Sequence, residues 1–234
     1  MRNVLVLMGD GINSENELAL AFSRQGAEVK KMHVNELMNN PKALLNYKVL
    51  AIPGGFSFGD EIRSGKILAE KMKDILSNAL SQFKSNDGRM IGICNGFQVL
   101  SQLGAFDDNH DRSFTLAEND HGKFMDKWTT LDINSDNHSP WFKNLSGKIF
   151  LPVRHKEGRI ILKNDSVKLS SVLRYESDVN GSFDRIAGVV DKSGQIFGLM
   201  PHPEVACHGF LHPFRDGAEE NAKKIQQLFI NGLS

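Results

Sequence analysis

Residues 89–104 read RMIGICNGFQVLSQLG, and this stretch says most about the architecture. Residues 90–93 form a short apolar run of the kind found in buried strands, whereas residues 95–103 read as a helix that a glycine ends. A strand that passes into a helix through one tight turn is typical of α/β proteins. We therefore expect a strand–turn–helix unit here, within a larger sheet.

The chain before this stretch repeats the alternation of strands and helices. Ser14, followed three residues later by Glu17, has the spacing of a capping box and predicts a helix that Gly26 closes. Apolar residues at helical spacing predict a longer helix between Ile67 and Phe83. Strands are expected at residues 4–8, 27–34 and 49–52. The alternation predicts an α/β fold with a doubly wound, mostly parallel sheet.

The second half of the sequence has short strand-like runs separated by turns. These runs predict hairpins or meanders of antiparallel strands appended to the same sheet. A last helix, over residues 218–229, is expected to pack back on the core. The runs lie at residues 129–133, 148–153, 159–162, 167–175, 186–190 and 195–200. Neither an internal repeat nor a shift in composition marks a boundary, so we expect a single domain over residues 1–234.

The composition narrows the class of protein. The 234 residues include 28 Lys and Arg and 28 Asp and Glu, so the formal net charge is zero. A protein that mainly binds nucleic acid needs a basic face, and this balance argues against that role. No apolar stretch approaches the roughly 20 residues that span a membrane, and no signal-peptide pattern is present. Two cysteines make no disulfide framework, so we expect a cytoplasmic protein.

The turn at residues 92–96 carries the first chemical signal. It has the spacing glycine, any residue, nucleophile, any residue, glycine, with Cys94 in the nucleophile position. A cysteine at a helix N-terminus is favoured as the reactive thiolate, and the backbone N–H of Asn95 could help bind an oxyanion. The alternative is a buried structural cysteine in a tight turn, because free cysteines are commonly buried.

Pro53, Gly54 and Gly55 end another expected strand, at what should be the same edge of the sheet. Ligands of open α/β sheets collect beyond the carboxyl ends of the strands. Two glycines there would expose backbone N–H groups, which an oxyanion hole requires. The alternative is an ordinary glycine-rich turn.

A cysteine nucleophile needs a base, and the base usually needs a carboxylate to orient it. The sequence offers two matching pairs, His155 with Glu157 and His202 with Glu204. Each pair follows a strand-like run, so the residues alone do not choose between them. Either histidine could also be a surface residue near a turn.

Two other kinds of site are not expected in this chain. Cys207, His208 and His212 lie near one histidine pair, but their spacing fits no usual metal-ligand pattern, so we expect no metal. The sequence has no phosphate-binding loop of the G-x-x-x-x-G-K-[ST] kind, so ATP chemistry would have to occur on another chain.

With these motifs in place, the chain resembles the glutaminase subunits of phosphoribosylformylglycinamidine synthases, a family of class I (triad-type) glutamine amidotransferases. The resemblance covers nearly the whole chain. It rests on residues 53–60 (PGGFSFGD), 92–98 (GICNGFQ), 152–159 (PVRHKEGR), 180–182 (NGS) and 198–204 (GLMPHPE). The chain departs from the family pattern at Phe58, at residues 177–179 and at Val205.

The resemblance implies a flavodoxin-like sheet and a role for each motif residue. It implies Cys94 as the nucleophile, His202 as the base and Glu204 as the carboxylate that orients the base. The other implied site residues are the oxyanion donors Gly55 and Asn95 and the glutamine-binding residues Gln98, Gly54 and His155. His155 and Glu157 match a further family motif, expected at the pocket rim or at a partner interface.

The resemblance also implies the reaction and the partners. Glutamine would be hydrolysed to glutamate and ammonia through a Cys94 thioester, with no cofactor in this chain. Ammonia would pass to a synthetase subunit that makes formylglycinamidine ribonucleotide, with a small accessory subunit in the same complex and ATP and Mg²⁺ on the synthetase. The alternatives are an amidotransferase for another product, a stand-alone protease-like cysteine hydrolase and a non-catalytic module on the same fold.

Overall fold

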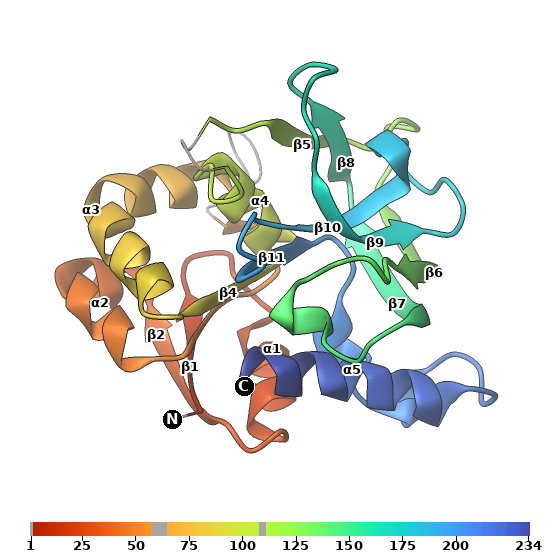
Figure 1. Ribbon diagram of the computed structural model, residues 1–234, viewed down its shortest axis with the longest axis horizontal. Coiled ribbons are helices and arrows are strands. Elements are labelled where there is room, and N and C mark those ends of the chain that lie inside the picture. The colour runs from red at the N-terminus through yellow and green to blue at the C-terminus, as the bar shows by residue number, and fades with distance from the viewer. Residues whose placement is uncertain (1, 58–64, 108–110) are drawn as a thin grey trace.

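Within residues 2–57, 65–107 and 111–234, which the computed structural model describes, one sheet has nine strands in the order β2-β1-β3-β4-β11-β10-β9-β6-β7 (Figure 1). Its parallel part consists of β2 (Glu28–His33), β1 (Asn3–Met8), β3 (Val49–Ile52), β4 (Arg89–Ile93) and β11 (Ile196–Leu199). Its antiparallel part continues with β10 (Ile186–Val190), β9 (Ser170–Tyr175), β6 (Met125–Ile133) and β7 (Gly147–His155). Outside this sheet, β5 (Phe114–Glu118) and β8 (Glu157–Leu162) pair with each other.

Helices cover both faces of the parallel part (Figure 1). One face is covered by α1 (Glu15–Ser23) and α5 (Ala218–Gly232), and the other by α2 (Val34–Asn39), α3 (Lys66–Ser85) and α4 (Asn95–Gln102). The described residues also include short 3-10 turns, which are η1 (Pro41–Asn46), η3 (Pro140–Phe142), η4 (Phe183–Arg185), η5 (Pro203–Val205) and η6 (Gly209–Leu211).

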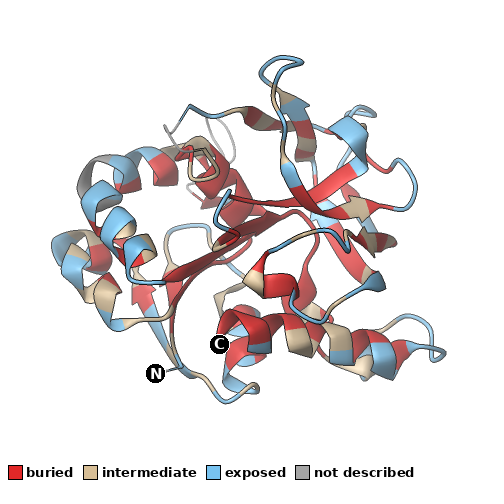
Figure 2. Cartoon of the chain, in the orientation of Figure 1, coloured by how far each residue is buried: buried red, intermediate tan, exposed pale blue. Residues whose placement is uncertain are grey.

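The core lies on both sides of the central strands, which are buried along their length (Figure 2). In β1, Val4 and Val6 belong to the core beneath α1 and α5, whereas Leu5 and Leu7 belong to the core beneath α2 and α3. Successive side chains of a strand point to opposite faces, so a continuous apolar run is what a sheet covered on both faces needs.

The α/β fold with a doubly wound parallel sheet and appended antiparallel strands is confirmed. The strands expected at residues 4–8, 49–52 and 90–93 are β1, β3 and β4, and the helix expected at 218–229 is α5. The helix expected between Ile67 and Phe83 is α3, of which the side chains of residues 74–76 lie outside the described part. Residues 58–64, including Phe58, also lie outside it.

Some expectations were wrong in detail. The run at 159–162 does not join the main sheet, because β8 finds its partner in β5, where Phe114 and Leu116 bury Ile160. The run at 195–200 is β11, which is antiparallel to β10 but parallel to β4, at the centre of the sheet. Strand β5 and helix α2 were not predicted; α2 begins at Val34, inside the strand expected at 27–34.

The capping box at Ser14 is also wrong. Ser14 is the N-cap residue of α1, but its side chain makes no capping hydrogen bond and Oγ donates to Oδ1 of Asn13 at 3.2 Å instead. The backbone N–H of Ser14 donates to the carbonyl of Gly54 at 3.4 Å. The start of α1 is therefore tied to the turn that follows β3.

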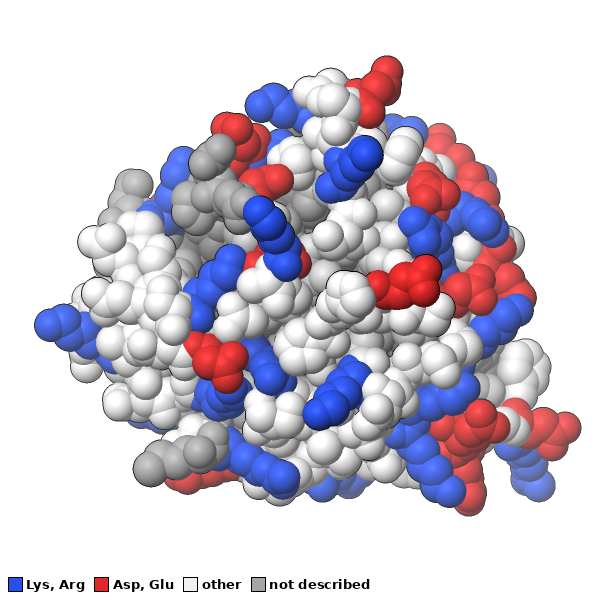
Figure 3. All heavy atoms as spheres, in the orientation of Figure 1, with Lys and Arg blue, Asp and Glu red and all other residues white. Residues whose placement is uncertain are grey.

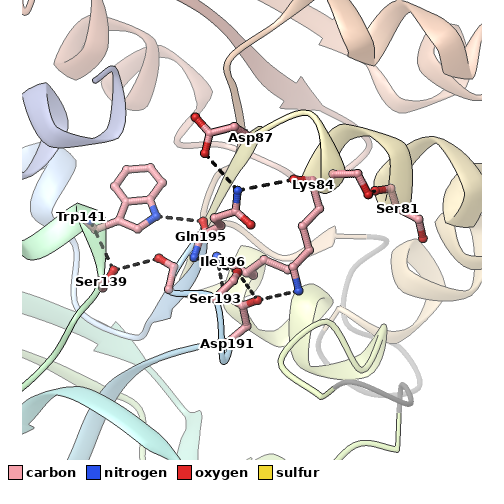
Figure 4. Close-up of polar contacts among 11 residues, drawn as sticks. Ser81, Lys84, Asp87, Ser139, Trp141, Asp191, Ser193, Gln195 and Ile196 are labelled. Carbon is pink, nitrogen blue, oxygen red and sulfur yellow. Dashed lines mark hydrogen bonds and ion pairs between the residues drawn. The ribbon is translucent and has the colours of Figure 1, made fainter.

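A polar network fixes the turn between β10 and β11 (Figure 4). Asp191 is buried, forms an ion pair with Lys84 of α3 at 2.6 Å and accepts the N–H of Ile196 at 2.9 Å. The Nε1–H of Trp141 donates to the carbonyl of Gln195 at 3.0 Å. These contacts hold the first residue of β11 beside α3, so they help to fix the register of β11 next to β4.

The surface charge and the helix composition do not indicate a further class of protein. Basic and acidic side chains are interspersed over the face drawn in Figure 3. No helix in the described ranges is long and apolar enough to cross a membrane.

Candidate active site

Cys94 lies on a strained turn between β4 and α4. Its φ of 52° and ψ of −106° are values that a residue with a side chain rarely adopts. The flanking glycines explain how the turn is possible: a Cβ on Gly96 would collide with the carbonyl of Ile52, and a Cβ on Gly92 would lie 2.5 Å from the carbonyl of Gly96. The spacing of the motif is therefore a steric requirement of the turn, and the thiol is held at the edge of the sheet.

The neighbours of β4 bring the other site segments to Cys94. Both β3 and β11 are parallel to β4, so all three strands end at the same edge. The N–H of Cys94 donates to the carbonyl of Leu199, the last residue of β11, at 2.8 Å. A Cβ on Gly54, just after β3, would lie 3.0 Å from Cε1 of His202 and 3.5 Å from Cβ of Cys94. The segments after β3, β4 and β11 are therefore in contact.

His202 and Glu204 form a buried pair beside Cys94. Nδ1 of His202 lies 2.6 Å from Oε1 of Glu204, and the two residues are 6% and 4% exposed. Nε2 is the ring nitrogen left to interact with Cys94, since Nδ1 is taken by Glu204. Burial lowers the pKa of His202, but the Glu204 carboxylate and the interaction with Cys94 outweigh burial and raise it to about 10. His202 is therefore an imidazolium at neutral pH, which stabilises a thiolate next to it.

Gly55 can offer its backbone N–H to the cavity. Its φ of +145° is open to glycine and rare for other residues. Gly55 forms an isolated antiparallel bridge with Ile12, in which the hydrogen bonds come from the flanking N–H groups of Phe56 and Asn13, at 2.8 and 3.3 Å. In such a pair the N–H of Gly55 itself points away from the partner segment. This N–H is therefore not used in the bridge, and Gly55 lines the same cavity as Cys94.

Asn95 and Gln98 connect the turn at Cys94 to the segment that contains Glu157. Asn95 is the first residue of α4, where backbone N–H groups point out of the helix end beside Cys94. Its side-chain Nδ2 donates to Oε1 of Gln98 at 2.9 Å, and Nε2 of Gln98 donates to the carbonyl of Glu157 at 2.7 Å. The amide of Gln98 is therefore held in one orientation.

His155 lies in the same cavity wall but in a different environment from His202. It is 3% exposed, and its Nδ1 lies 3.1 Å from Oδ1 of Asn119; the described contacts include no hydrogen bond to the Glu157 carboxylate. Burial, and then the charges of His202 and His121, lower the pKa of His155 to about 3. The two histidine pairs that look alike in sequence therefore differ: His155 is neutral, and His202 is charged.

These residues surround a cavity of about 470 Å³, a size that suits a small ligand. The lining residues are Asn13, Ser14, Glu17, Gly55, Phe56, Cys94, Gln98, Glu118, Phe124, Arg154, His155, Lys156, Glu157, His202, Glu204 and Val205. Gly54 and Asn95 adjoin this lining, close to His202 and Gln98. The structure therefore brings all the residues expected at the site together.

Several site residues were not found from the sequence. The carbonyl oxygen of Arg154 lies 3.7 Å from Sγ of Cys94, and Asn119 holds His155. Asn13 and Ser14 hold the carbonyl of Gly54. The glycine-rich turn after β1 ends at the same sheet edge and could have indicated Asn13 and Ser14; no local motif marks Asn119.

The described ranges contain no group of three His, Cys, Asp or Glu side chains placed to hold a metal ion. Sγ of Cys207 donates to the carbonyl of Pro203 at 3.3 Å. Burial, and then the charge of Glu204, raises the pKa of the Cys207 thiol well above its ordinary value. Cys207 is therefore an unreactive thiol close to, but not in, the cavity.

Known proteins are similar to this chain in sequence and in fold. The CobB/CobQ-like glutamine amidotransferase domain matches residues 1–234. The protein named phosphoribosylformylglycinamidine synthase subunit PurQ from Dehalococcoides mccartyi is 34% identical, over 98% of this chain and 95% of its own length. The subunit of the same name from Thermotoga maritima is 35% identical, over 97% and 96%. A chain in the structure of PurLQS from Thermotoga maritima has a TM-score of 0.79 and 31% identity, with 99% of both chains covered.

Proposed function

Because the chain belongs to the family of CobB/CobQ-like glutamine amidotransferases, we propose that it is the glutaminase subunit of phosphoribosylformylglycinamidine synthase in purine biosynthesis. It hydrolyses glutamine to glutamate and ammonia. The ammonia is delivered to a synthetase subunit that makes formylglycinamidine ribonucleotide. Residues 1–234 act as a single glutamine amidotransferase domain.

The observation that carries the proposal is the position of Cys94. It stands on the strained turn at the sheet edge, next to a buried and charged His202, in a cavity that Gly55 also lines. A thiol, a base oriented by Glu204 and backbone donors at one point are the parts that acyl transfer from an amide needs.

In the first half of the reaction, the thiolate of Cys94 attacks the side-chain carbonyl carbon of glutamine. The carbonyl oxygen becomes an oxyanion, which accepts hydrogen bonds from the N–H groups of Gly55 and Asn95. His202 then donates the proton on Nε2 to the leaving nitrogen, ammonia departs and a glutamyl thioester remains on Cys94. Glu204 keeps its hydrogen bond to Nδ1 throughout, so the ring stays oriented.

In the second half, the neutral His202 takes a proton from a water molecule that attacks the thioester carbon. The same backbone donors bind the second oxyanion. The carbon–sulfur bond breaks, glutamate forms and Cys94 returns to the thiolate beside a protonated His202. Loss of one oxyanion donor would raise the barrier by roughly 3 kcal/mol, or about a hundredfold in rate.

The partners and the location follow from the same proposal. The chain associates with the synthetase subunit and a small accessory subunit, and ATP and Mg²⁺ bind to the synthetase, because this sequence contains no phosphate-binding loop. The complex is cytoplasmic. Gln98, Gly54 and His155 contact glutamine in the cavity.

Glutamate release tests the proposal. It is measured for the chain alone and for the chain mixed with the synthetase subunit, the accessory subunit and nucleotides. We expect slow release by the chain alone and faster release in the complex, because a free-running glutaminase would waste glutamine. Cys94→Ser should abolish glutamine-dependent synthesis and leave ammonia-dependent synthesis intact. Equal rates in both conditions would indicate a stand-alone hydrolase, and an active Cys94→Ser variant would exclude the mechanism.

A further inference from the structure

The ring of His155 carries a polar atom that the proposed reaction does not use. His155 lines the cavity and is 3% exposed, and its Nε2 is buried without a hydrogen-bond partner within the described residues. Buried polar atoms are nearly always hydrogen-bonded, so an unpaired one at the wall of a ligand cavity points to a ligand.

The hydrogen bonds of Asn119 determine which ring nitrogen of His155 carries the proton. Nδ2 of Asn119 donates both of its hydrogens to backbone carbonyls, those of His155 and Lys123, each at 3.0 Å. The side-chain oxygen of Asn119 is therefore the atom that faces Nδ1 of His155 at 3.1 Å, and an oxygen of this kind only accepts. Nδ1 must carry the proton, which leaves a lone pair on Nε2.

One edge of the His155 ring is covered by neighbouring residues, and the other edge carries the Nε2 lone pair. The Nδ1–Cε1 edge is covered, because Asn119 contacts Nδ1 and a Cβ on Gly158 would collide with the same edge. The opposite edge carries the buried, unpaired Nε2, and His155 lines the cavity. Burial and the neighbouring His202 keep the pKa of His155 at about 3, so the ring stays neutral and Nε2 remains an acceptor.

The basic side chains of the same wall are each paired with a carboxylate. Lys156 is paired with Glu118 at 3.0 Å, and Arg154 with Asp126 at 3.5 Å. Glu157, which also lines the cavity, has no ion pair among the contacts described. The Glu157 side chain is therefore an acceptor that suits a cationic N–H donor of the ligand.

Glutamine has two nitrogen groups, and the proposed reaction uses one of them. The carboxamide nitrogen must face His202, which protonates it as it leaves. On the basis of the proposed function, we propose that Nε2 of His155 accepts a hydrogen bond from the α-ammonium group of glutamine. Asn119 is then a positioning residue, which holds His155 in the tautomer that can accept.

A motif that the reaction leaves unused supports the position of Asn119. The carbonyl of Asn180 accepts the N–H of Asp120 at 3.2 Å, and a Cβ on Gly181 would lie 2.8 Å from Cβ of Asp120. Residues 180–182 therefore pack against the turn that carries Asn119. Their contribution to the site is indirect, through this turn.

The test compares glutamine with its analogue that lacks the α-amino group, 4-carbamoylbutanoate, in the assembled complex. With the natural chain, kcat/KM for glutamine should exceed that for the analogue by roughly 10- to 100-fold, the effect of one hydrogen bond to a charged group. His155→Leu should lower kcat/KM for glutamine by about the same factor and lower that for the analogue much less. His155→Gln, whose side-chain oxygen can accept, should restore part of the difference.

The matched control is His138→Leu, at an exposed histidine that does not line the cavity, which should keep the natural ratio. Equal use of glutamine and the analogue by the natural chain would overturn the inference without any variant, and so would an equal loss for both substrates in His155→Leu. Either result leaves the proposed function intact, because glutamate is still released. A complex with no glutaminase activity at all would instead remove the proposed function, and the inference with it.

Discussion

The neutral state of His155 makes a quantitative prediction about stability. Its pKa is about 3 in the folded protein and 6.5 in an unfolded chain. Between these values the unfolded chain binds a proton that the folded protein does not, so the free energy of unfolding falls as the pH falls. From about pH 7 to about pH 5, this one group should remove about 2 kcal/mol of stability. Replacing it should remove that part of the acid sensitivity.

The experiment is urea unfolding of the natural chain and of His155→Gln, followed by circular dichroism at both pH values. His202 has a raised pKa, so its contribution is fully present below pH 6.5 and is lost as the pH rises toward about 10. Because both proteins contain His202, its effect cancels in the comparison. The same replacement at exposed His138 controls for the loss of a histidine as such. If the natural chain and His155→Gln lose equal stability on acidification, His155 is not a buried neutral histidine.

Three further predictions concern the residues around Cys94. Gly54→Ala should fold, but its Cβ would lie 3.0 Å from Cε1 of His202, so we expect kcat for glutamine to fall roughly tenfold; Gly9→Ala, whose Cβ would make only ordinary contacts, is the control. His202→Ala should lower glutaminase kcat by about a thousandfold or more in steady-state assays, because it removes the base and the proton donor together. A diazo-ketone analogue of glutamine should label Cys94 and spare Cys207 in peptide mass spectra, since the Cys207 thiol is buried with a raised pKa; labelling of Cys207 would contradict the assignment.

The part of the fold that could be predicted is the part that depends on local signals. The turn at Cys94 was found because a strand, a glycine-flanked turn and a helix follow one another within a few residues. Strand β8 was placed in the wrong sheet because its sequence shows that it is a strand but not which strand it pairs with. The central place of strand β11 was missed for the same kind of reason, because its pairing with β4 joins residues about a hundred positions apart in the chain.

The same distinction holds for the site. Cys94 and Gly55 belong to turns that their own neighbours in sequence define. Asn119, in contrast, reaches His155 from a separate turn, and its amide is oriented by the carbonyls of His155 and Lys123. An asparagine in a polar turn has no local property that distinguishes this role. Its contribution became visible only when the hydrogen bonds around His155 were known.

The two histidine pairs show how the backbone, rather than the residue types, determines the chemistry. His202 and Glu204 are separated by Pro203, which begins the 3-10 turn η5 and has a fixed φ. The tight turn brings the ring and the carboxylate to 2.6 Å, and the histidine becomes charged. In the other pair, β7 ends at His155 and β8 begins at Glu157, with a bend at Lys156 between two strands that pair in different sheets. The ring there turns to a neutral amide and stays uncharged, so the proline between histidine and glutamate is the signal that distinguishes a base from a hydrogen-bond acceptor.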